Sequence, residues 1–337
     1  MVAAVSMAAL PSIDARHAAM GQESPPLRWA VYQGGSGQGS GKHVVFVTGD
    51  EEYRSEEGMP MLAKILSERH GFTCTVLFAI NPDTGEIDPE TITNIPGLHL
   101  LEEADLMVMF IRWRDLPDEQ MKHIIDYTNS GKPIIGLRTA THPFSYDEGS
   151  ESAYVRYHWN SEDLPGGYGQ AVFGETWAYH HGEHGDESTR GLVNGLFQDR
   201  PILNGVTDIW GPTDVYGIRE LPEDSEILVY GQVLGGMEPT SPPNLSKSIM
   251  PIAWTRAYTG ETGNTARVFA TTMGASVDLL SEDLRRLLVN AVFWSIGMES
   301  ETPERADVSF IGTYEPTYFG FGEHTKGVKP ADLEIER

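Results

Sequence analysis

A dense histidine motif is the sharpest chemical feature of this sequence. The segment 180–185 reads HHGEHG and places His180, His181 and His184 beside Glu183. Neutral imidazoles with a carboxylate are suitable Zn²⁺ ligands, and a histidine oriented by a carboxylate can act as a general base near neutral pH. The two glycines argue against a helix, so this is not the HExxH arrangement of metalloproteases. Three alternatives follow: acid/base or substrate chemistry by His181 and His184, a zinc site formed by all three histidines, or a solvated polar loop.

Polar side chains also gather where the predicted strands end. In an open parallel sheet, ligands bind beyond the carboxyl ends of the strands, where the loops meet. The strand ends carry Glu52 after the first strand, Arg112 and Arg114 after the third, Arg138, Thr139 and His142 after the fourth, and Thr272 at the last. We predict catalytic roles for the glutamate and the histidine, and substrate contacts for the arginines and threonines. The alternative is that the arginines only pair with nearby carboxylates.

The end of the fourth predicted strand has a distinctive shape. Residues 136–140 read GLRTA, which is the small-x-x-x-small pattern of a nucleophile elbow, with the middle side chain raised above the sheet. That side chain is Arg138, whose planar fork suits a carboxylate, a phosphate or a network of sugar hydroxyls. The structural alternative is an ion pair between Arg138 and Glu51 or Glu52.

Aromatic residues crowd into the predicted loops between 154 and 210. The apolar C–H faces of sugar rings stack on indole and phenol rings, and a pocket with apolar walls and a few polar groups fits this pattern. We predict substrate contacts for Trp159, Asn160 and Trp177. Further side chains that could bind hydroxyls are Glu175, Asp214 and Gln232. The alternative is that the rings only pack this segment onto the domain.

The elements that must position these residues alternate along the chain. Continuous apolar runs of strand length occupy 43–48, 75–80, 106–111 and 133–137, and later 227–234, 251–258 and 267–273. Amphipathic helical patterns follow the first and third runs and end at Gly71 and Gly131, and a third helix contains Leu284. Unalternating strands separated by helices predict an α/β fold with a parallel sheet covered on both faces.

Composition divides the chain into three predicted parts. Residues 33–42 (QGGSGQGSGK) have the composition of an unpacked linker, which ends an N-terminal segment over 1–41. The folded domain is predicted over 42–298, and an extended, glycine-containing arm over 299–337. Inside the domain, residues 145–204 lack periodicity. We therefore expect a long irregular insertion rich in aromatic residues and histidine.

The charge balance excludes several classes of partner. The chain has 337 residues, 49 acidic and 24 basic side chains, and a formal net charge of −25. Nucleic-acid binding depends on lysine and arginine set against phosphates, and an anionic membrane surface repels acidic proteins in the same way. No run of 18 apolar residues occurs, so no transmembrane helix is predicted. We expect neither a nucleic-acid nor a membrane partner.

The N-terminus and the single cysteine bear on the compartment. One cysteine, Cys74, permits neither an intrachain disulfide nor a cysteine-based metal site. Residues 2–10 (VAAVSMAAL) form a short apolar run like a shortened signal peptide, but the first basic residue is Arg16, beyond that run. We favour a periplasmic or secreted location, with a cytoplasmic one as the alternative.

Several motifs taken together resemble the ThuA-like (trehalose-utilisation) family. They are GKHVVFVTGDEEYRSEE at 41–57, GLRTATHPF at 136–144, HWN at 158–160, FGETWAYHHGEHG at 173–185 and TTMGASVDL at 271–279. The resemblance spans about 42–298 and continues through FGFG and KGVKPAD in the tail. It implies a flavodoxin-type, class I glutamine amidotransferase-like, doubly wound sheet. For activity it implies only a link to sugar catabolism, since most members of the family have no assigned reaction.

The residues argue against glutamine amidotransferase chemistry. That reaction needs a cysteine thiolate at the elbow, activated by a histidine and a carboxylate. Arg138 occupies the elbow position, and a guanidinium is not a nucleophile. Cys74 lies at the amino end of the second predicted strand, the wrong end of the sheet, and is expected to be a small buried apolar residue.

The combined expectation is a protein that binds or processes a small-molecule carbohydrate or keto sugar at the C-terminal edge of the sheet. It would require no cofactor, with Zn²⁺ as an option, and could form a homo-oligomer. The alternatives are a catalytically silent binding module and a metal-dependent hydrolase. On the first view, Arg138→Ala and His181→Ala should each abolish sugar binding or turnover while changing the melting temperature by only a few degrees.

Overall fold

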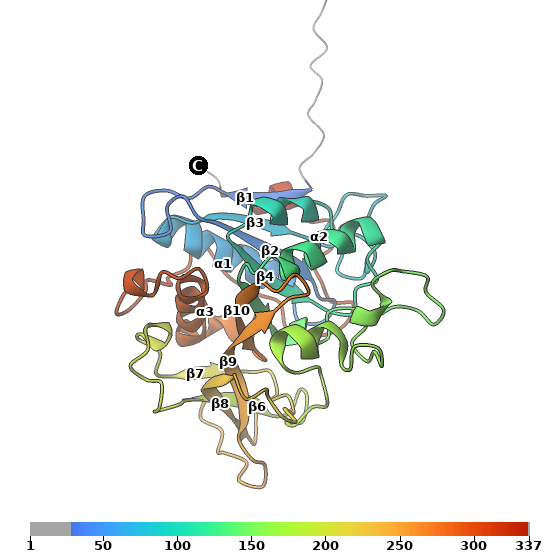
Figure 1. Ribbon diagram of the computed structural model, residues 1–337. Helices are drawn as coiled ribbons and strands as arrows, with labels where there is room; N and C mark the ends of the chain where they lie inside the picture. Colours follow the sequence, from blue (N-terminus) through green and yellow to red (C-terminus); the bar gives the residue numbers. More distant parts are fainter. Residues whose placement is uncertain (1–27, 336–337) are drawn as a thin grey trace, which may run out of the picture.

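The apolar runs of the sequence form the parallel half of a ten-stranded sheet in the computed structural model, which describes residues 28–335 (Figure 1). The parallel strands are β2 (His43–Gly49), β3 (Thr73–Leu77), β4 (Leu106–Ile111), β5 (Ile134–Leu137) and β10 (Thr265–Thr271). Their spatial order is β3-β2-β4-β5-β10. Because all five run in one direction, the loops that follow them meet at one edge of the sheet.

Antiparallel strands extend the sheet at both ends. β1 (Trp29–Tyr32) pairs with β3, and β9 (Met250–Thr259) pairs with β10. Beyond β9 follow β8 (Glu226–Leu234), β6 (Ser188–Val193) and β7 (Ile209–Gly211). In Figure 1, β6 to β9 lie in the lower half of the view, whereas β1 lies at the top beside β3. The four strands that the chain forms between β5 and β10 all belong to this antiparallel half of the sheet.

Three α-helices cover the two faces of the sheet. α1 (Ser55–His70) and α3 (Glu282–Ser295) pack into one hydrophobic core, and α2 (Asp118–Asn129) packs into the core on the opposite face. As predicted, α1 ends at Gly71, whose φ of 84° permits the left-handed turn that bonds its N–H back to Ser67. Among residues 28–335, no helix combines the length and apolarity needed to cross a membrane.

Shorter helical turns connect these elements. The 3₁₀ turns are Leu98–Glu103, Arg138–Thr141, Val155–Tyr157, Pro201–Leu203, Asp278–Leu280, Glu299–Glu301 and Pro330–Leu333, and a π-helical turn occupies Gly169–Phe173.

The α/β class is confirmed, while some expected boundaries are wrong. The second strand ends at Leu77 and not at residue 80, although Phe78, Ala79 and Ile80 remain buried. An apolar run indicates that residues are buried, but it does not show where a strand ends, because burial here continues into the loop. β6 also lies inside the 145–204 segment that was expected to lack regular structure. Its pattern is partly exposed and interrupted by Gly191, so no apolar run marked it.

The glycine-rich segment 33–42 is mostly exposed, but some of its glycines pack against the end of α1, which differs from the wholly unpacked linker expected from its composition. A Cβ on Gly34 would lie 2.2 Å from the carbonyl oxygen of Gly71, and one on Gly39 would lie 2.4 Å from the ring of Phe72. The Gly39 amide also donates to the carbonyl of His70 at 2.8 Å. The glycines thus allow close approach to the end of α1. The expected signal peptide lies outside the described residues.

The C-terminal arm is held against its own chain. Ala306, Val308 and Phe319 are buried in the core that contains α1 and α3. The arm also bonds to the start of α1: the Thr317 amide donates to the Glu57 carboxylate at 2.8 Å, and Arg54 donates to the carbonyl of Gly320 at 2.7 Å. This path carries the arm past the C-terminal edge of β2.

Candidate functional site

Arg138 lies at a strained backbone position directly after β5. Its φ is 44°, in the left-handed region that residues with a Cβ seldom adopt. Gly136 permits the strand to pass the ring of Phe173, since a Cβ there would come within 2.4 Å of it. The elbow shape is therefore present. The side chain of Arg138, however, is fully buried and does not project into solvent.

The Arg138 guanidinium is satisfied almost entirely by the protein. It donates to the Asp214 carboxylate at 2.7 Å, to the carbonyl oxygens of Asp214 and Thr272 at 2.8 Å each, and to the Tyr53 hydroxyl at 3.2 Å. Its carbon lies 4.5 Å from the ring centroid of Tyr53 and 3.9 Å from that of Tyr216. The expected ion pair with Glu51 or Glu52 is replaced by one with Asp214. Arg138 thus holds the site together and is not free to bind a ligand.

Asp214 is the hub of the site. Its carboxylate is fully buried and accepts from His180 Nδ1 at 2.7 Å and from His184 Nδ1 at 3.1 Å, in addition to Arg138. The other ring nitrogen of His184 lies 3.2 Å from the Glu52 carboxylate. The two imidazole centroids are 5.0 Å apart, and their side chains are 38% and 34% exposed. Two solvent-accessible histidines are thereby fixed by one buried carboxylate.

The charges of this cluster fix the protonation of its members. The hydrogen bonds that His184 donates to Asp214 and then to Glu52 raise its pKa to about 9, despite its partial burial. Burial alone would raise the pKa of Asp214, but the Arg138 charge and the two histidine bonds outweigh it and hold that pKa well below its usual range. Burial also raises the pKa of Glu52, but its hydrogen bond with His184 and the charge of Arg112 outweigh burial and lower this pKa. At neutral pH the cluster therefore contains an imidazolium between two carboxylates.

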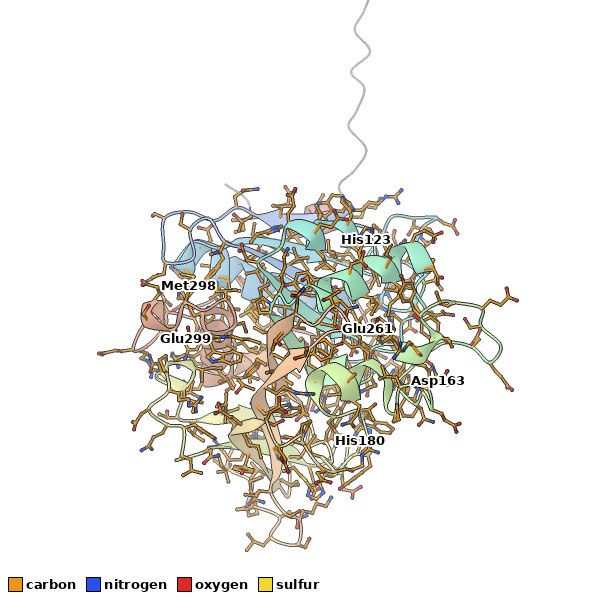
Figure 2. All side chains as sticks on the ribbon, viewed as in Figure 1. His123, Asp163, His180, Glu261, Met298 and Glu299 are labelled. Atoms are coloured by element: carbon orange, nitrogen blue, oxygen red, sulfur yellow. The ribbon has the colours of Figure 1, made fainter. Side chains whose placement is uncertain are left out.

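His181, predicted as a catalytic or metal-binding residue, does not join this cluster. Its Nε2 bonds to the carbonyl of Ser248 at 2.8 Å, and its ring lies against Tyr179. The adjacent His180, labelled in Figure 2, instead turns toward Asp214. Neighbouring side chains in this loop thus point to different partners, and only His180 and His184 converge.

Arg112 and Arg114 have different environments. Arg114 is fully buried and donates to the Glu51 carboxylate and to the carbonyls of Arg112 and Pro89, so it has no free donor face for a substrate. Arg112 pairs with Glu51 and lies 3.7 Å from the Glu52 carboxylate. It also stacks 3.9 Å from the ring centroid of Trp113. Of the two, only Arg112 lies beside the histidine cluster.

The remaining strand-end residues are buried around the cluster. Thr139 donates its hydroxyl to Asp50, and Thr272 supplies the carbonyl that Arg138 bonds. His142 is buried, and its burial together with the charges of Arg112 and Arg138 lowers its pKa well below the usual value. A neutral imidazole bonded to the Thr141 hydroxyl at 3.1 Å is suited to positioning. These residues support the site and do not face solvent.

Aromatic rings form one wall of the site. The Trp177 ring lies 5.5 Å from His180 and 6.2 Å from Trp159, which in turn lies 6.0 Å from Trp113. All three indoles are partly exposed. The indole N–H of Trp113 is buried without a partner among residues 28–335, and the residue has a φ of 47°. The predicted Asn160 is exposed, and no hydrogen bond of its side chain occurs in the described residues.

The C-terminal arm completes the site. The sequence did not predict this role for the arm. Phe319 lies 5.2 Å from the His184 ring and 5.6 Å from Tyr53. Phe321 lies 5.0 Å from the Arg112 guanidinium and is 58% exposed. The amide of Gly320 between them donates to the carbonyl of Glu52 at 2.8 Å. The only sequence signal for this role was the FGFG run itself.

The cluster also has the donor atoms of a metal site. Ligand atoms of His180, His184 and Asp214 all lie within 4.8 Å of one another. Two imidazoles and a carboxylate suit Zn²⁺. Zinc would have to displace the proton of His184. The set differs from the predicted one because Asp214 takes the place of His181.

The comparisons with known proteins are few. No family model and no curated protein sequence matches the chain. Among solved structures it is similar to a ThuA-like protein from Bacteroides uniformis ATCC 8492, with 14% identity and a TM-score of 0.44 over 75% of this chain and 90% of that one. A ThuA-like protein from Parabacteroides merdae ATCC 43184 gives 15% identity and a TM-score of 0.44 over 76% and 90%. At these TM-scores the likeness carries no argument about chemistry, but ThuA-like proteins are among the structural neighbours of the chain.

Proposed function

We propose that this chain is a ThuA-like protein of carbohydrate catabolism that binds a sugar or keto sugar beside His180 and His184. We propose that it removes a proton from the bound sugar. The observation that carries the proposal is the buried Asp214 carboxylate, which orients two solvent-accessible imidazoles at once. We further propose the flavodoxin-type, class I glutamine amidotransferase-like, doubly wound fold with an irregular aromatic and histidine-rich insertion. The order of the parallel strands, which is 2-1-3-4-5 in chain order, supports it.

The hydrogen bonds assign different roles to the two histidines. A carboxylate only accepts, so the neutral form of His180 carries its proton on Nδ1 and has a free lone pair on Nε2. His184 contacts a carboxylate through each nitrogen, so both nitrogens carry protons. His180 is therefore suited to act as a general base, and the His184 imidazolium to stabilise negative charge that develops on the substrate.

This arrangement favours proton abstraction next to a carbonyl over glycoside hydrolysis. Hydrolysis of a glycosidic bond uses a protonated carboxylic acid as the general acid. Glu52 and Asp214 both have lowered pKa values, so both are ionised at neutral pH. In a keto sugar, His180 would take the α-proton while the resulting enolate oxygen lies near His184 or Arg112. The partly exposed indoles of Trp159 and Trp177 would stack on the sugar ring.

Thiol chemistry of the amidotransferase kind is not part of the proposal. Cys74 lies in β3, at the opposite end from the loops of the site, and is fully buried. Burial raises the pKa of its thiol far above the usual value, so the nucleophilic thiolate does not form at neutral pH.

The two neighbouring histidines provide a matched test. We expect wild-type protein in D₂O to exchange the protons α to the carbonyl of ketohexoses or oxidised disaccharides, measured by NMR. His180→Gln should slow the exchange by about 10²-fold or more, the usual contribution of a general base. His181→Gln, on the same loop but bonded to Ser248, should change it less than about twofold. Equal rates in the two variants, or no exchange by the wild type with any of these sugars, would overturn the proposed chemistry.

A second candidate is a zinc-dependent hydrolase, because three donor atoms already converge. Since zinc must displace the His184 proton, its affinity should rise by about tenfold per pH unit up to about pH 9. Isothermal titration with Zn²⁺ across this range would measure the slope, with elemental analysis for stoichiometry. Asp214→Asn should abolish binding and His181→Gln should preserve it. Metal-free wild-type protein that also fails to bind added zinc would dispose of this candidate.

A further inference from the structure

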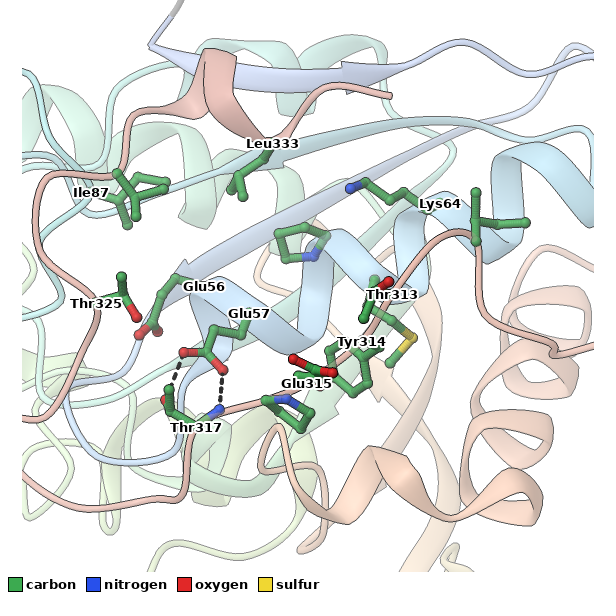
Figure 3. A pocket seen from close by; sticks show the side chains of 15 residues that line it. Glu56, Glu57, Lys64, Ile87, Thr313, Tyr314, Glu315, Thr317, Thr325 and Leu333 are labelled. Atoms are coloured by element: carbon green, nitrogen blue, oxygen red, sulfur yellow. Dashed lines mark hydrogen bonds between the residues drawn. The ribbon is translucent and has the colours of Figure 1, made fainter. Parts of the chain in front are cut away.

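A separate cavity of about 300 Å³ lies between α1 and the C-terminal arm (Figure 3). None of its lining residues belongs to the Asp214 cluster. Its apolar walls come from Pro60 and Met61 on α1, Ile87 on the loop after β3, and Tyr314, Val328 and Leu333 on the arm. This volume and lining are those of a site for a small organic molecule.

The cavity is lined by a carboxyl group without a partner. Glu56 is only 9% exposed, and neither of its carboxylate oxygens has a hydrogen-bond partner among residues 28–335. It is the only carboxyl group in that part of the chain whose two oxygens are both buried and unpaired. Neighbouring Glu57, by contrast, accepts from the amide and hydroxyl of Thr317 at 2.8 and 2.6 Å. Leaving a buried polar group unpaired costs free energy that a bound donor would recover.

The charges around the cavity favour a cation. Three glutamates, Glu56, Glu57 and Glu315, line it against one basic side chain, Lys64. Lys64 lies at the far end of the cavity from Glu56 in Figure 3. A positive group near Glu56 therefore meets an acidic environment, and an anion there would be repelled.

We propose that this cavity binds a small organic ammonium ion, with its charged group paired to the Glu56 carboxylate and its hydrocarbon body against Met61, Ile87 and Leu333. The ammonium supplies three donors to the two unpaired oxygens. The site is independent of the sugar chemistry proposed above.

Proton release gives the proposal a specific signature. Burial raises the pKa of Glu56 to about 8, so the free carboxyl is mostly protonated at neutral pH. The charged groups around it are Arg54 and Glu57 at the start of α1, Asp50 directly after β2, Lys64 further along α1, and Glu315 on the arm, where the Tyr314 hydroxyl also lies nearby. Pairing with an ammonium ion stabilises the ionised form, so binding at neutral pH must release close to one proton.

The test uses the full chain and 2-phenylethylammonium chloride as the probe. Isothermal titration near neutral pH, repeated in buffers of different ionisation enthalpy, should show saturable binding with release of nearly one proton. The uncharged analogue 2-phenylethanol should bind at least about tenfold more weakly, and phenylacetate should not bind. No heat with the ammonium probe, or equal affinity for the alcohol, overturns the proposal.

Matched variants locate the binding group. Glu56→Gln should lose at least about tenfold in affinity and all proton release, whereas Glu315→Gln, an exposed carboxyl at the same cavity, should stay within about twofold. If Glu56→Gln does not fold, Glu56→Leu serves instead, since it carries no unpaired polar atom. Unchanged probe affinity in a folded Glu56 variant would overturn the proposal.

Discussion

Asp214→Ala is expected to lower the free energy of unfolding by about 3 to 5 kcal/mol, because it leaves the buried Arg138 guanidinium without its counter-charge. Both side chains are fully buried and their atoms lie 2.7 Å apart. Arg138 would keep its bonds to the backbone carbonyls of residues 214 and 272, but these are neutral acceptors. Urea denaturation of wild type and variant at neutral pH would measure the difference.

An exposed ion pair of the same chemistry is the control. Arg190 pairs with Asp208, whose side chain is 76% exposed. Asp208→Ala should therefore cost less than about 1 kcal/mol. The double variant Asp214→Ala with Arg138→Leu should recover part of the loss, because no unpaired charge remains. Equal costs for Asp214→Ala and Asp208→Ala would contradict the buried pair as the hub of the site.

The same geometry corrects the expectation for Arg138→Ala. A ligand-binding arginine can be removed with little effect on the melting temperature, and the sequence alone allowed that expectation. The side chain is instead fully buried, with bonds to Asp214, Thr272 and Tyr53 and two tyrosine rings beside its guanidinium. Its removal must lower stability together with function, so it cannot separate the two. His180, which is 38% exposed, is the better functional probe.

Glu56 should make wild-type stability fall as the pH rises between about 4.5 and 8. The folded protein holds this carboxyl protonated up to a pKa of about 8, while the unfolded chain ionises it near the ordinary glutamate pKa of 4.5. The folded state therefore binds more protons in this window, and the free energy of unfolding decreases with pH. Between about pH 5.5 and about pH 8.5 the loss from this group should be about 3 kcal/mol.

Glu56→Leu isolates this contribution. The variant should lack the pH-dependent loss and should be more stable than wild type at about pH 8.5, because it removes a buried group that has no partner. Glu315→Gln, at an exposed position of the same cavity, should retain the wild-type pH dependence. Parallel urea titrations of the three proteins at both pH values would measure the difference. A wild-type slope that persists in Glu56→Leu would contradict the burial of an unpaired carboxyl.

Local pattern was sufficient for most of the parallel half of the fold. β4 occupies the predicted residues, and α1 ends at Gly71 as predicted. Both could be predicted because a buried strand and the end of a helix depend on a few consecutive residues. β1 and β7, with four and three residues, were not predicted. Such short strands exist because a neighbour pairs with them. Composition alone predicts a linker at the packed glycines 34 and 39, because it does not show which backbone lies against them.

The sequence by itself determined that arginines, threonines and a histidine follow the parallel strands, and hence which edge of the sheet carries the site. It also determined that the elbow holds an arginine and no cysteine. Only the tertiary structure decided which groups meet: His180 and His184 converge while His181 turns away. Arg138 takes Asp214, 76 residues further along, as its partner. Strand periodicity is a local property of the backbone, whereas partners across long irregular loops depend on how those loops pack, and no short stretch of sequence records that.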